Sequence, residues 1–414
     1  MKILVIGCGY VGLTTGTCFA EMGNEVVCSD NDTEKIDNLK SGTMPLYEPG
    51  LEELVKRNVN DKRLSFSTNS NAHDKDIIIC AVGTPTKEDG QTDLTDVYKV
   101  AKEVGKTARK DAVFVMKSTV PVGTNMKCKQ YLPCHVASNP EFLRQGAAVK
   151  DTMTPDRIVV GVESDYTKKR MEQLFSPIVR TGKPLLCMDI ASAELTKYAA
   201  NAFLSTKISF INEIADLCDG NGANIRNVAR GIGLDDRIGP RFLQAGIGYG
   251  GSCLGKDNKS LINQAEKVGR HLGIVKAAEA RNEKQKDSVI EKLYNHFGEL
   301  DGKIIVLLGL SFKPKTDDLR DAPSQEIIKK LEQKGATVRT YDPVAKTKKT
   351  TDMYEAMNGA DAIVLLTEWD EFRNLDFEKA KACMKGDLLI DGRNIFSPEL
   401  VKKAGLTYSG IGVS

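Results

Sequence analysis

Residues 2–12 read KILVIGCGYVG, a short aliphatic run that leads directly into glycines with the spacing G-x-G-x-x-G. The aliphatic run is typical of a strand that is buried in a parallel sheet. Leu13–Met22 continues with a helical pattern, and a second strand at Glu25–Ser29 ends at Asp30, eighteen residues after the last glycine of the motif. In such a unit the glycines admit a pyrophosphate at the helix N-terminus, and the acid binds a ribose hydroxyl. The order of these features predicts an NAD-binding Rossmann domain.

Two further aliphatic runs extend the pattern. Residues 75–81 (KDIIICA) and 112–117 (AVFVMK) predict buried strands, and they lead into the loops Val82–Thr86 and Ser118–Thr124. Strand C-termini in a doubly wound sheet face the ligand crevice. The hydroxyl side chains of these loops are therefore candidates for contacts to nicotinamide, phosphate or a catalytic water, with helix capping as the alternative. Lys35 lies either near the adenosine side of the cofactor or on a solvated helix.

A glycine-rich loop near the middle of the chain carries a cysteine. Residues 246–257 read GIGYGGSCLGKD, so that Cys253 is followed by Lys256 and Asp257. Glycines let a backbone approach a ligand closely or adopt positive φ angles, and a thiol beside a cation is more readily ionised to the reactive thiolate. The pattern favours a nucleophilic cysteine on a loop that wraps a polar substrate. The alternative is a flexible turn that carries a small buried residue.

A long helix is predicted from Ser192 to about Asp219, where Gly220 ends the pattern. Lys197 and Asn201 are four residues apart and share one face of this helix. A lysine that points into a cleft can stabilise an oxyanion, and the amide can orient a water or a sugar hydroxyl. A solvated helix face is the alternative for this pair.

Two more polar segments are candidates for ligand contacts. Residues 138–144 (SNPEFLR) place a carboxylate and an arginine in a proline-containing loop that suits substrate and water handling. The alternative is an exposed turn with a surface salt bridge. Arg237 is a candidate for a phosphate or sugar contact.

A second α/β pattern begins near Lys303. It includes a helix at Ser324–Lys334 and strands at 303–310, Thr337–Tyr341, Ala362–Thr367 and Asp387–Ile390. The pattern lacks G-x-G-x-x-G, so a second dinucleotide site is not expected. A nucleotide moiety of the substrate could use its strand ends, where Lys313, Arg320 and Arg393 stand.

Composition narrows the classes of function. With 414 residues, the chain is expected to form two to three domains. A net charge of +2 gives no global field for nucleic acid or a membrane. The ten cysteines include no C-x-x-C pair and there are four histidines, which argues against zinc and favours a reducing compartment. The first residues lack a signal cleavage site, and no apolar run reaches ~18 residues. We therefore expect a cytoplasmic protein without a metal.

Ordered motifs along the whole chain resemble the UDP-glucose/GDP-mannose dehydrogenase family of nucleotide-sugar 6-dehydrogenases. The motifs that carry this resemblance are Gly7–Gly12, Glu48–Leu51, Val82–Pro85, Ser118–Val120, Asn139–Leu143, Lys197 with Asn201, Arg237–Gly239, Gly250–Asp257, Phe312–Lys313 and Asp391–Arg393.

The resemblance implies an α/β fold of two Rossmann-like, doubly wound domains joined by a long central helix and a helical middle domain. Residues 1–191 would bind NAD, residues 192–295 would form the central dimerisation domain with the cysteine loop, and residues 296–414 would bind the UDP of a nucleotide sugar. It also implies a homodimer through the central helix, or a higher homo-oligomer.

The implied reaction is the four-electron oxidation of the C6 alcohol of a nucleotide sugar to a carboxylate, with two NAD+ reduced and one water consumed. Cys253 would be the nucleophile, through a thiohemiacetal and then a thioester. Lys197 would stabilise the oxyanion. Asn201 and Asp257 would position or deprotonate water, which Thr119 and Glu141 would help to hold.

The resemblance also implies the binding residues. Those for NAD are Gly7, Gly9, Tyr10, Val11, Gly12, Asp30, Lys35, Val82, Thr84, Pro85, Thr119, Gln145, Lys256 and Arg320. Those for the nucleotide sugar are Glu141, Phe142, Leu143, Arg144, Lys197, Asn201, Arg237, Tyr249, Gly250, Phe312, Lys313 and Arg393, with Arg237 reaching into the neighbouring subunit. Two positions depart from the family pattern: Gly255 replaces a usual proline, and Gln145 replaces a frequent glutamate.

Several alternatives stay open on the sequence. Residues 208–214 (ISFINEI), Arg237–Gly239 and the Tyr249 loop resemble the UDP-glucose branch, while UDP-N-acetylhexosamines and GDP-mannose are the other candidate substrates. A two-electron hydroxyacid dehydrogenase of the 6-phosphogluconate type would share the Rossmann domain and the Lys-x-x-x-Asn pair, but it would lack the cysteine loop and the second α/β domain. A non-catalytic regulator is disfavoured because four residues suited to catalysis are present together: Cys253, Lys197, Asn201 and Asp257.

Overall fold

The computed structural model describes residues 1–87, 89–345, 350 and 352–413. The chain divides into two compact units: Met1–Ala200 with Lys259–Arg270, and Asn201–Asn258 with His271–Ser414. We call them the N-terminal and the C-terminal unit. Helices α8 (Ile190–Asn221) and α10 (Leu254–Lys267) each contribute residues to both. The predicted division at residues 191 and 295 stays a prediction.

An eight-stranded sheet forms the centre of the N-terminal unit. Its strands are β1 (Lys2–Ile6), β2 (Glu25–Ser29), β3 (Leu64–Ser67), β4 (Ile77–Cys80), β5 (Val113–Met116), β6 (His135–Ser138), β7 (Ile158–Val162) and β8 (Leu185–Met188). Their order is β3-β2-β1-β4-β5-β6-β7-β8. The pairs are parallel except β6 with β7. The strand order reverses between β1 and β4, so the loops that follow these strands flank the ligand crevice of a doubly wound sheet.

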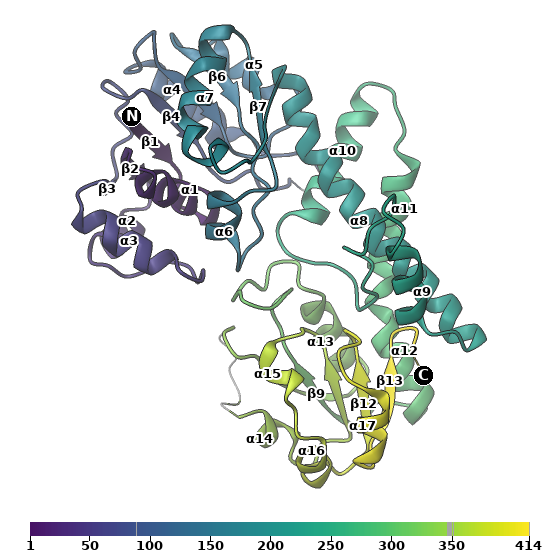
Figure 1. Cartoon of the computed structure of the whole chain (residues 1–414). Helices are drawn as coiled ribbons and strands as arrows, with labels where there is room; N and C mark the ends of the chain where they lie inside the picture. Colours follow the sequence, from purple (N-terminus) through teal and green to yellow (C-terminus); the bar gives the residue numbers. More distant parts are fainter. Residues whose placement is uncertain (88, 346–349, 351, 414) are drawn as a thin grey trace. The chain divides into compact units, whose positions relative to one another are not determined.

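Helices cover both faces of this sheet (Figure 1). They are α1 (Tyr10–Glu21), α2 (Thr33–Lys40), α3 (Leu51–Asn60), α4 (Thr95–Gly105), α5 (Thr124–Lys129), α6 (Ala148–Met153) and α7 (Asp165–Val179). Successive residues of β1 enter different cores: Val5 packs in the cluster with Phe19 of α1 and Met171 of α7, whereas Leu4 packs in the cluster with Val97 of α4. Because a strand buried on both faces needs apolar residues at its buried positions, residues 3–6 of β1 form an uninterrupted aliphatic run after the exposed Lys2.

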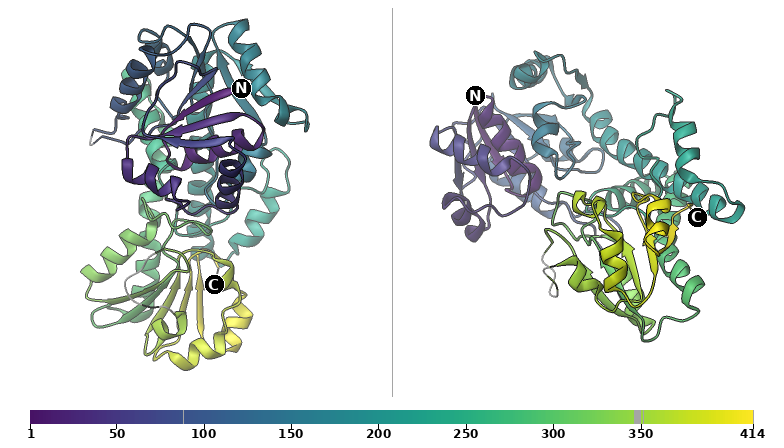
Figure 2. Two further views of the ribbon diagram at one scale, coloured as in Figure 1. Left: turned by 90° about the vertical axis from the view of Figure 1, so that its left-hand side faces the viewer. Right: turned by 60° about the horizontal axis from the view of Figure 1, so that its bottom comes forward.

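The C-terminal unit contains a five-stranded sheet. Its strands are β9 (Ile304–Leu308), β10 (Thr337–Tyr341), β11 (Ala362–Leu365), β12 (Leu388–Asp391) and β13 (Thr407–Gly410), in the order β10-β9-β11-β12-β13. All of these pairs are parallel. The left view of Figure 2 shows the strands side by side between helices. Val306 and Ile305 of β9 again enter two different cores, so this sheet is also buried on both faces.

The remaining helices belong to the C-terminal unit. They are α9 (Ile225–Gly233), α11 (Gly273–Gln285), α12 (Asp287–Phe297), α13 (Pro323–Gln333), α14 (Met353–Met357), α15 (Asp370–Arg373), α16 (Phe377–Cys383) and α17 (Pro398–Lys403). In the described part of the chain, none of the helices has the length and apolar character that crossing a bilayer requires. The predicted fold class, two Rossmann-like sheets with a helical middle, is confirmed. The antiparallel pairing of β7 departs from an all-parallel doubly wound sheet.

Candidate active site

The glycine turn after β1 fits a dinucleotide pyrophosphate. Gly7 has φ +101°, and a Cβ at Gly12 would lie 1.8 Å from the Gly7 carbonyl oxygen, so the turn itself requires both glycines. A Cβ at Gly9 would meet no atom within 4 Å, so open space faces this position. The N–H groups of Tyr10 and Val11 lie in the first turn of α1, where an α-helix has no acceptors of its own. An anion can approach the backbone there.

Asp30 stands beside this turn, directly after β2. Its Oδ2 accepts the Cys8 N–H at 2.7 Å and the Lys35 ammonium at 3.0 Å. Burial opposes ionisation of Asp30, but the hydrogen bonds from the Cys8 and Asp32 N–H groups and from Lys35 outweigh it, so the pKa is lowered. Asp30 is thus an ionised acceptor suited to a ribose hydroxyl. Lys35 contacts Asp30, rather than standing on an open helix surface.

The loops after β4 and β5 are tied to each other by their hydroxyl groups. Thr84 Oγ1 donates to the Thr119 carbonyl oxygen at 2.9 Å, and Ser118 Oγ donates to the Val82 carbonyl oxygen at 2.7 Å. The residues that cap α4 and α5 are Leu94 and Gly123, so the helix-capping alternative is wrong for these hydroxyls. Pro85 is exposed beside them.

A buried ion pair joins the 139–144 segment to α8. The Lys197 ammonium lies 2.9 Å from Glu141 Oε1, and Glu141 Oε2 accepts the Leu143 N–H at 2.6 Å. Burial opposes ionisation of Glu141, but the charge of Lys197 and its hydrogen bond outweigh it, so the pKa of Glu141 is lowered. Glu141 is 7% exposed and Lys197 4%, which excludes both the exposed turn and the solvated helix face as alternatives. The surface salt bridge exists, but Arg144 makes it with Asp151, at 2.5 Å.

Lys117, directly after β5, is a buried cation that the sequence patterns did not single out. Its ammonium donates to Asn139 Oδ1 at 2.9 Å. Burial lowers the pKa of Lys117 to about 8, while Glu141 opposes this shift and Lys197 adds to it. The only sequence signal is a lysine that ends a buried strand just before the Ser118 loop.

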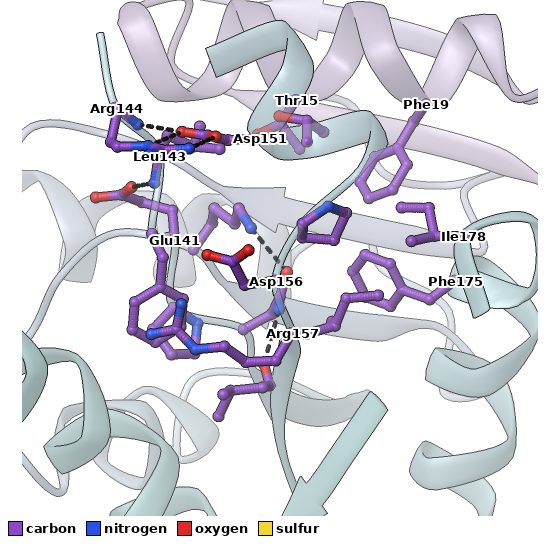
Figure 3. Close-up of a pocket in the computed structure, with 18 residues that line it drawn as sticks. Thr15, Phe19, Glu141, Leu143, Arg144, Asp151, Asp156, Arg157, Phe175 and Ile178 are labelled. Atoms are coloured by element: carbon purple, nitrogen blue, oxygen red, sulfur yellow. Dashed lines mark hydrogen bonds and ion pairs between the residues drawn. The ribbon is translucent and has the colours of Figure 1, made fainter. Parts of the chain in front are cut away.

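Figure 3 shows the pocket that Glu141, Asp156 and Arg157 line in the N-terminal unit. Phe142 also lines it, and the Arg157 guanidinium carbon lies 3.8 Å from the centroid of the Phe142 ring. Gln145, just beyond this segment, is half-buried.

In the C-terminal unit, Cys253 stands directly before α10. It is exposed, and its Sγ lies 3.8 Å from Ser252 Oγ. A helix N-terminus favours a thiolate. Asp257, one helical turn later, is buried between two partners: its Oδ1 lies 3.0 Å from the Lys256 ammonium, and its Oδ2 accepts the Asn201 amide at 2.7 Å. The structure thus gathers Asn201, Lys256 and Asp257 at the start of the helix that Cys253 precedes.

The loop before Cys253 is packed against the protein itself. A Cβ at Gly250 would lie 2.3 Å from the Asp321 carbonyl oxygen, and a Cβ at Gly251, where φ is +84°, would lie 2.8 Å from the Phe312 ring. Tyr249 is buried, and its hydroxyl donates to the Glu279 carboxylate. Because Cys253 is exposed, the alternative of a flexible turn with a small buried residue is wrong, and Gly250 and Gly251 serve close packing in the C-terminal unit.

Four cationic candidates of the C-terminal unit differ in their surroundings. Arg393 donates to the Leu366 carbonyl oxygen at 2.7 Å and also approaches the glycine loop, while the Lys313 ammonium lies 5.4 Å from the centroid of the Phe312 ring. The hydrogen bonds that Arg320 donates to the Asp318 carboxylate raise the pKa of Arg320, and the charge of Cys253 acts in the same direction. The Arg237 side chain is 89% exposed and pairs with Asp235 at 2.6 Å.

A doubly wound sheet with this glycine turn and Asp30 defines a dinucleotide-binding protein. Among the described residues no group of three or more His, Cys, Asp and Glu side chains could hold a metal ion. Three profiles of the UDP-glucose/GDP-mannose dehydrogenase family match the chain: the NAD binding domain at residues 1–179, the central domain at 191–284 and the UDP binding domain at 306–398. The chain belongs to this family.

Individual relatives match over nearly the whole chain. The UDP-glucose 6-dehydrogenase TuaD of Bacillus subtilis is 46% identical, over 99% of this chain and 93% of that protein. A UDP-glucose 6-dehydrogenase of Pseudomonas aeruginosa is 43% identical, over 100% and 97%. Among solved structures, a UDP-glucose dehydrogenase from Pyrobaculum islandicum is 34% identical with a TM-score of 0.91, covering 100% and 98% of the two chains.

A second structural relative is named for a different sugar. It is a UDP-D-ManNAc dehydrogenase from Pyrococcus horikoshii, 27% identical with a TM-score of 0.91, covering 100% of this chain and 99% of that one. The predictions of the family, of an NAD-dependent dehydrogenase and of NAD as its cofactor are confirmed. The UDP binding domain excludes the two-electron hydroxyacid dehydrogenase, which would lack it.

Proposed function

We propose that this enzyme oxidises C6 of UDP-glucose to a carboxylate, so that UDP-glucose, two NAD+ and one water yield UDP-glucuronate and two NADH. The observation that carries the proposal is an exposed Cys253 at the N-terminus of α10, one helical turn before a buried Asp257 that is bonded to Asn201. The relatives named UDP-glucose 6-dehydrogenase support UDP-glucose as the sugar. The Pyrococcus horikoshii relative keeps a UDP-N-acetylhexosamine as the second candidate.

In this proposal bound NAD accepts the hydrides, and the chain supplies the remaining chemistry. The Cys253 thiolate adds to C6 at the aldehyde level to form a thiohemiacetal, whose oxidised form is a thioester. Lys197 stabilises the oxyanion at C6. A water positioned by Asn201 and Asp257, with Thr119 and Glu141, adds its oxygen to the thioester carbon, and the Cys253 thiolate leaves.

The thioester explains why the second oxidation needs a cysteine. A thiohemiacetal holds the aldehyde on the protein between the two oxidations, so a reactive aldehyde is not released. Asn201 lies one turn after Lys197 on α8, and Asp257 accepts its amide at 2.7 Å. This hydrogen bond supports a shared role for α8, which carries Lys197, and α10, which Cys253 directly precedes.

The remaining assignments belong to the same proposal. Phe312, Lys313 and Arg393 bind the UDP part of the substrate, and Arg237 acts in the site of a second copy. We propose a homodimer through α8, because Phe203, Phe210 and Leu217 are 67%, 49% and 61% exposed at seven-residue spacing on one face of this helix. The cytoplasm is the proposed location.

The test is the amount of NADH formed per mole of limiting UDP-glucose, with the sugar product identified. Two equivalents with UDP-glucuronate are expected. Replacing Cys253 by Ser should lower acid formation by ~10³-fold, because the hydroxyl is a far weaker nucleophile at neutral pH. Cys383→Ser, at a half-buried cysteine of α16, is the matched control and should keep full activity. One equivalent of NADH with an aldehyde product would contradict the cysteine mechanism. Turnover on UDP-N-acetylhexosamine or GDP-mannose alone would assign a different sugar.

A further inference from the structure

The Glu48–Leu51 motif has no role in the reaction described above, yet the Glu48 carboxylate is buried in the N-terminal unit. Its Oε1 accepts the Ala148 N–H at 2.7 Å, and its Oε2 accepts the Gly146 N–H at 2.6 Å. The Tyr10 hydroxyl donates to the same Oε2 and accepts the Gly146 N–H at 2.9 Å. The Glu48 carboxylate therefore joins its own segment to two others that are distant in the sequence: the one that contains Tyr10 and the one that contains Gly146 and Ala148.

Two of these three segments carry ligand functions. Tyr10 opens α1 directly after Gly9, so its backbone belongs to the turn that fits the pyrophosphate. Gly146 closes the segment that begins at Asn139 and carries Glu141, the carboxylate ion-paired with Lys197. A shift of either segment changes the hydrogen bonds of Glu48, because both segments bond to the same carboxylate oxygen.

We propose that Glu48 is a positioning residue that ties the dinucleotide turn to the 139–148 segment, so that NAD binding and oxidation at C6 depend on one buried carboxylate. The inference rests on the proposed function. All of the hydrogen bonds at the Glu48 carboxylate are donated to it, by the hydroxyl of Tyr10 and by the N–H groups of Gly146 and Ala148. Only a group that accepts at both oxygens satisfies this set. A glutamine of the same size would set its NH2 group against one of the two backbone N–H donors and leave that donor unpaired.

The competing explanation is that Glu48 only supports the fold of the N-terminal unit. In that case its loss lowers stability but leaves the NAD dissociation constant and kcat of the folded enzyme unchanged. Tyr10→Phe separates the two explanations, because it removes one hydroxyl and leaves both backbone N–H bonds to Glu48 in place.

The experiment compares Glu48→Gln, Tyr10→Phe and the double variant in the full chain. NAD affinity is measured by calorimetry without a sugar, and kcat and KM are measured from NADH formation with UDP-glucose. Glu48→Gln is expected to weaken NAD binding by about tenfold, the change that corresponds to ~1.4 kcal/mol, and to lower kcat by a similar factor. The double variant is expected to bind NAD no more weakly than Glu48→Gln alone, because both changes break the same connection. Losses that multiply in the double variant would overturn the proposal.

Glu163→Gln is the matched control. Glu163 also accepts a backbone N–H, from Val136 at 3.0 Å, but it follows β7 at the edge of the sheet where β6 begins, opposite the ligand loops. This variant is expected to lower the Tm while NAD affinity and kcat stay at the wild-type values. If Glu48→Gln changes only the Tm in the same way, Glu48 is a support for the fold and the proposal is wrong.

Two further measurements distinguish a variant that fails to fold, or a wrong proposed function, from a wrong role for Glu48. If Glu48→Gln fails to fold, Tyr10→Phe carries the test, and an unchanged dissociation constant for NAD in that variant overturns the proposal. Wild-type NADH formation from UDP-glucose tests the proposed function separately, because NAD binding measured without a sugar does not depend on which sugar is oxidised.

Discussion

Lys117 directly follows β5 with its ammonium buried, and a lysine in this position makes stability depend on pH. Burial lowers its pKa from 10.5 to about 8, so between these values the unfolded chain binds a proton that the folded chain does not. The stability of the wild type relative to Lys117→Met should therefore rise from pH 8 to pH 10.5, by roughly 3 kcal/mol. Below pH 8 the cost of burying the charge is fully present. Urea unfolding of both proteins across this range is the measurement, and a difference that does not vary with pH would contradict the prediction.

The ion pair of Lys197 and Glu141 should separate stability from activity. Lys197→Met leaves the Glu141 carboxylate buried without its closest cation, which we expect to cost ~3 kcal/mol in the free energy of unfolding. Adding Glu141→Gln removes the stranded charge and should restore most of that stability. Activity should stay lost in the double variant, because both groups act in the proposed reaction. Chemical denaturation and NADH formation measure the two effects.

An exposed ion pair is the control for burial. Arg57 pairs with Glu21 at 2.7 Å on the surface of the N-terminal unit. Arg57→Met should cost less than ~1 kcal/mol, because solvent already screens this pair. An equally large loss at both pairs would show that burial does not decide the effect.

At these positions the sequence shows which side chains are present, but it does not show whether they are buried or which residues they contact. The i, i+4 spacing of Lys197 and Asn201 is visible in the sequence, but a solvated face fits the spacing equally well, and only the fold shows that both are buried. The sequence does not mark Lys117 because the residues that act on it come from other segments. Asn139, which accepts a hydrogen bond from its ammonium, follows β6, and Lys197, a second cation that lowers its pKa, belongs to α8. The role of Glu48 is hidden for the same reason, since all three of its donors are distant in sequence.

At the scale of the elements, two glycines near the start of α10 are expected to change the stability of the protein in opposite directions when each is replaced by alanine. Gly255 lies in the first turn of the helix, and a Cβ there would meet no atom within 4 Å. Gly255→Ala should therefore stabilise the protein by about 0.5–1 kcal/mol through helix propensity. Gly250→Ala should destabilise it, because its Cβ would lie 2.3 Å from the Asp321 carbonyl oxygen. Urea unfolding measures both, and equal effects of the two substitutions would refute the packing argument.

The ends of two strands could be predicted closely. The bounds of β2 coincide with the predicted ones because an apolar run between polar residues marks both ends, and the bounds of β10, a partly exposed strand at the edge of its sheet, coincide as well. The pairing of β6 with β7 could not be predicted in the same way. His135–Ser138 is short and partly polar, and its antiparallel partner is chosen by tertiary contacts such as the Asn139 amide bonded to the Val159 carbonyl oxygen.

At the scale of the whole molecule, both sheets are built from alternating strands and helices. The aspartate that follows the second strand, however, has different hydrogen-bond partners in the two sheets. Asp30 follows β2 and keeps an orientation suited to a ribose hydroxyl beside the glycine turn. Asp342 follows β10, and its Oδ2 accepts the N–H groups of Leu310 and Ser311 at 2.7 and 3.1 Å as well as the Trp369 indole. The protein's own donors surround Asp342. This agrees with the absence of G-x-G-x-x-G from the second half and with a domain that binds UDP instead.

Subunit assembly is expected to depend on the exposed apolar face of α8, which the sequence shows only as apolar residues on a helix. Phe203 and Phe210 are large, exposed and aligned. If a second copy covers them, Phe203→Glu/Phe210→Glu places two charges in a buried apolar interface and should yield monomers in sedimentation equilibrium. Leu400→Glu, at a residue of α17 that is 58% exposed, is the control and should keep the wild-type mass. Because Arg237 is proposed to act in the partner's site, the monomer should also lose turnover while it still binds NAD. A variant that keeps the mass of the wild-type assembly would place the interface elsewhere on the chain.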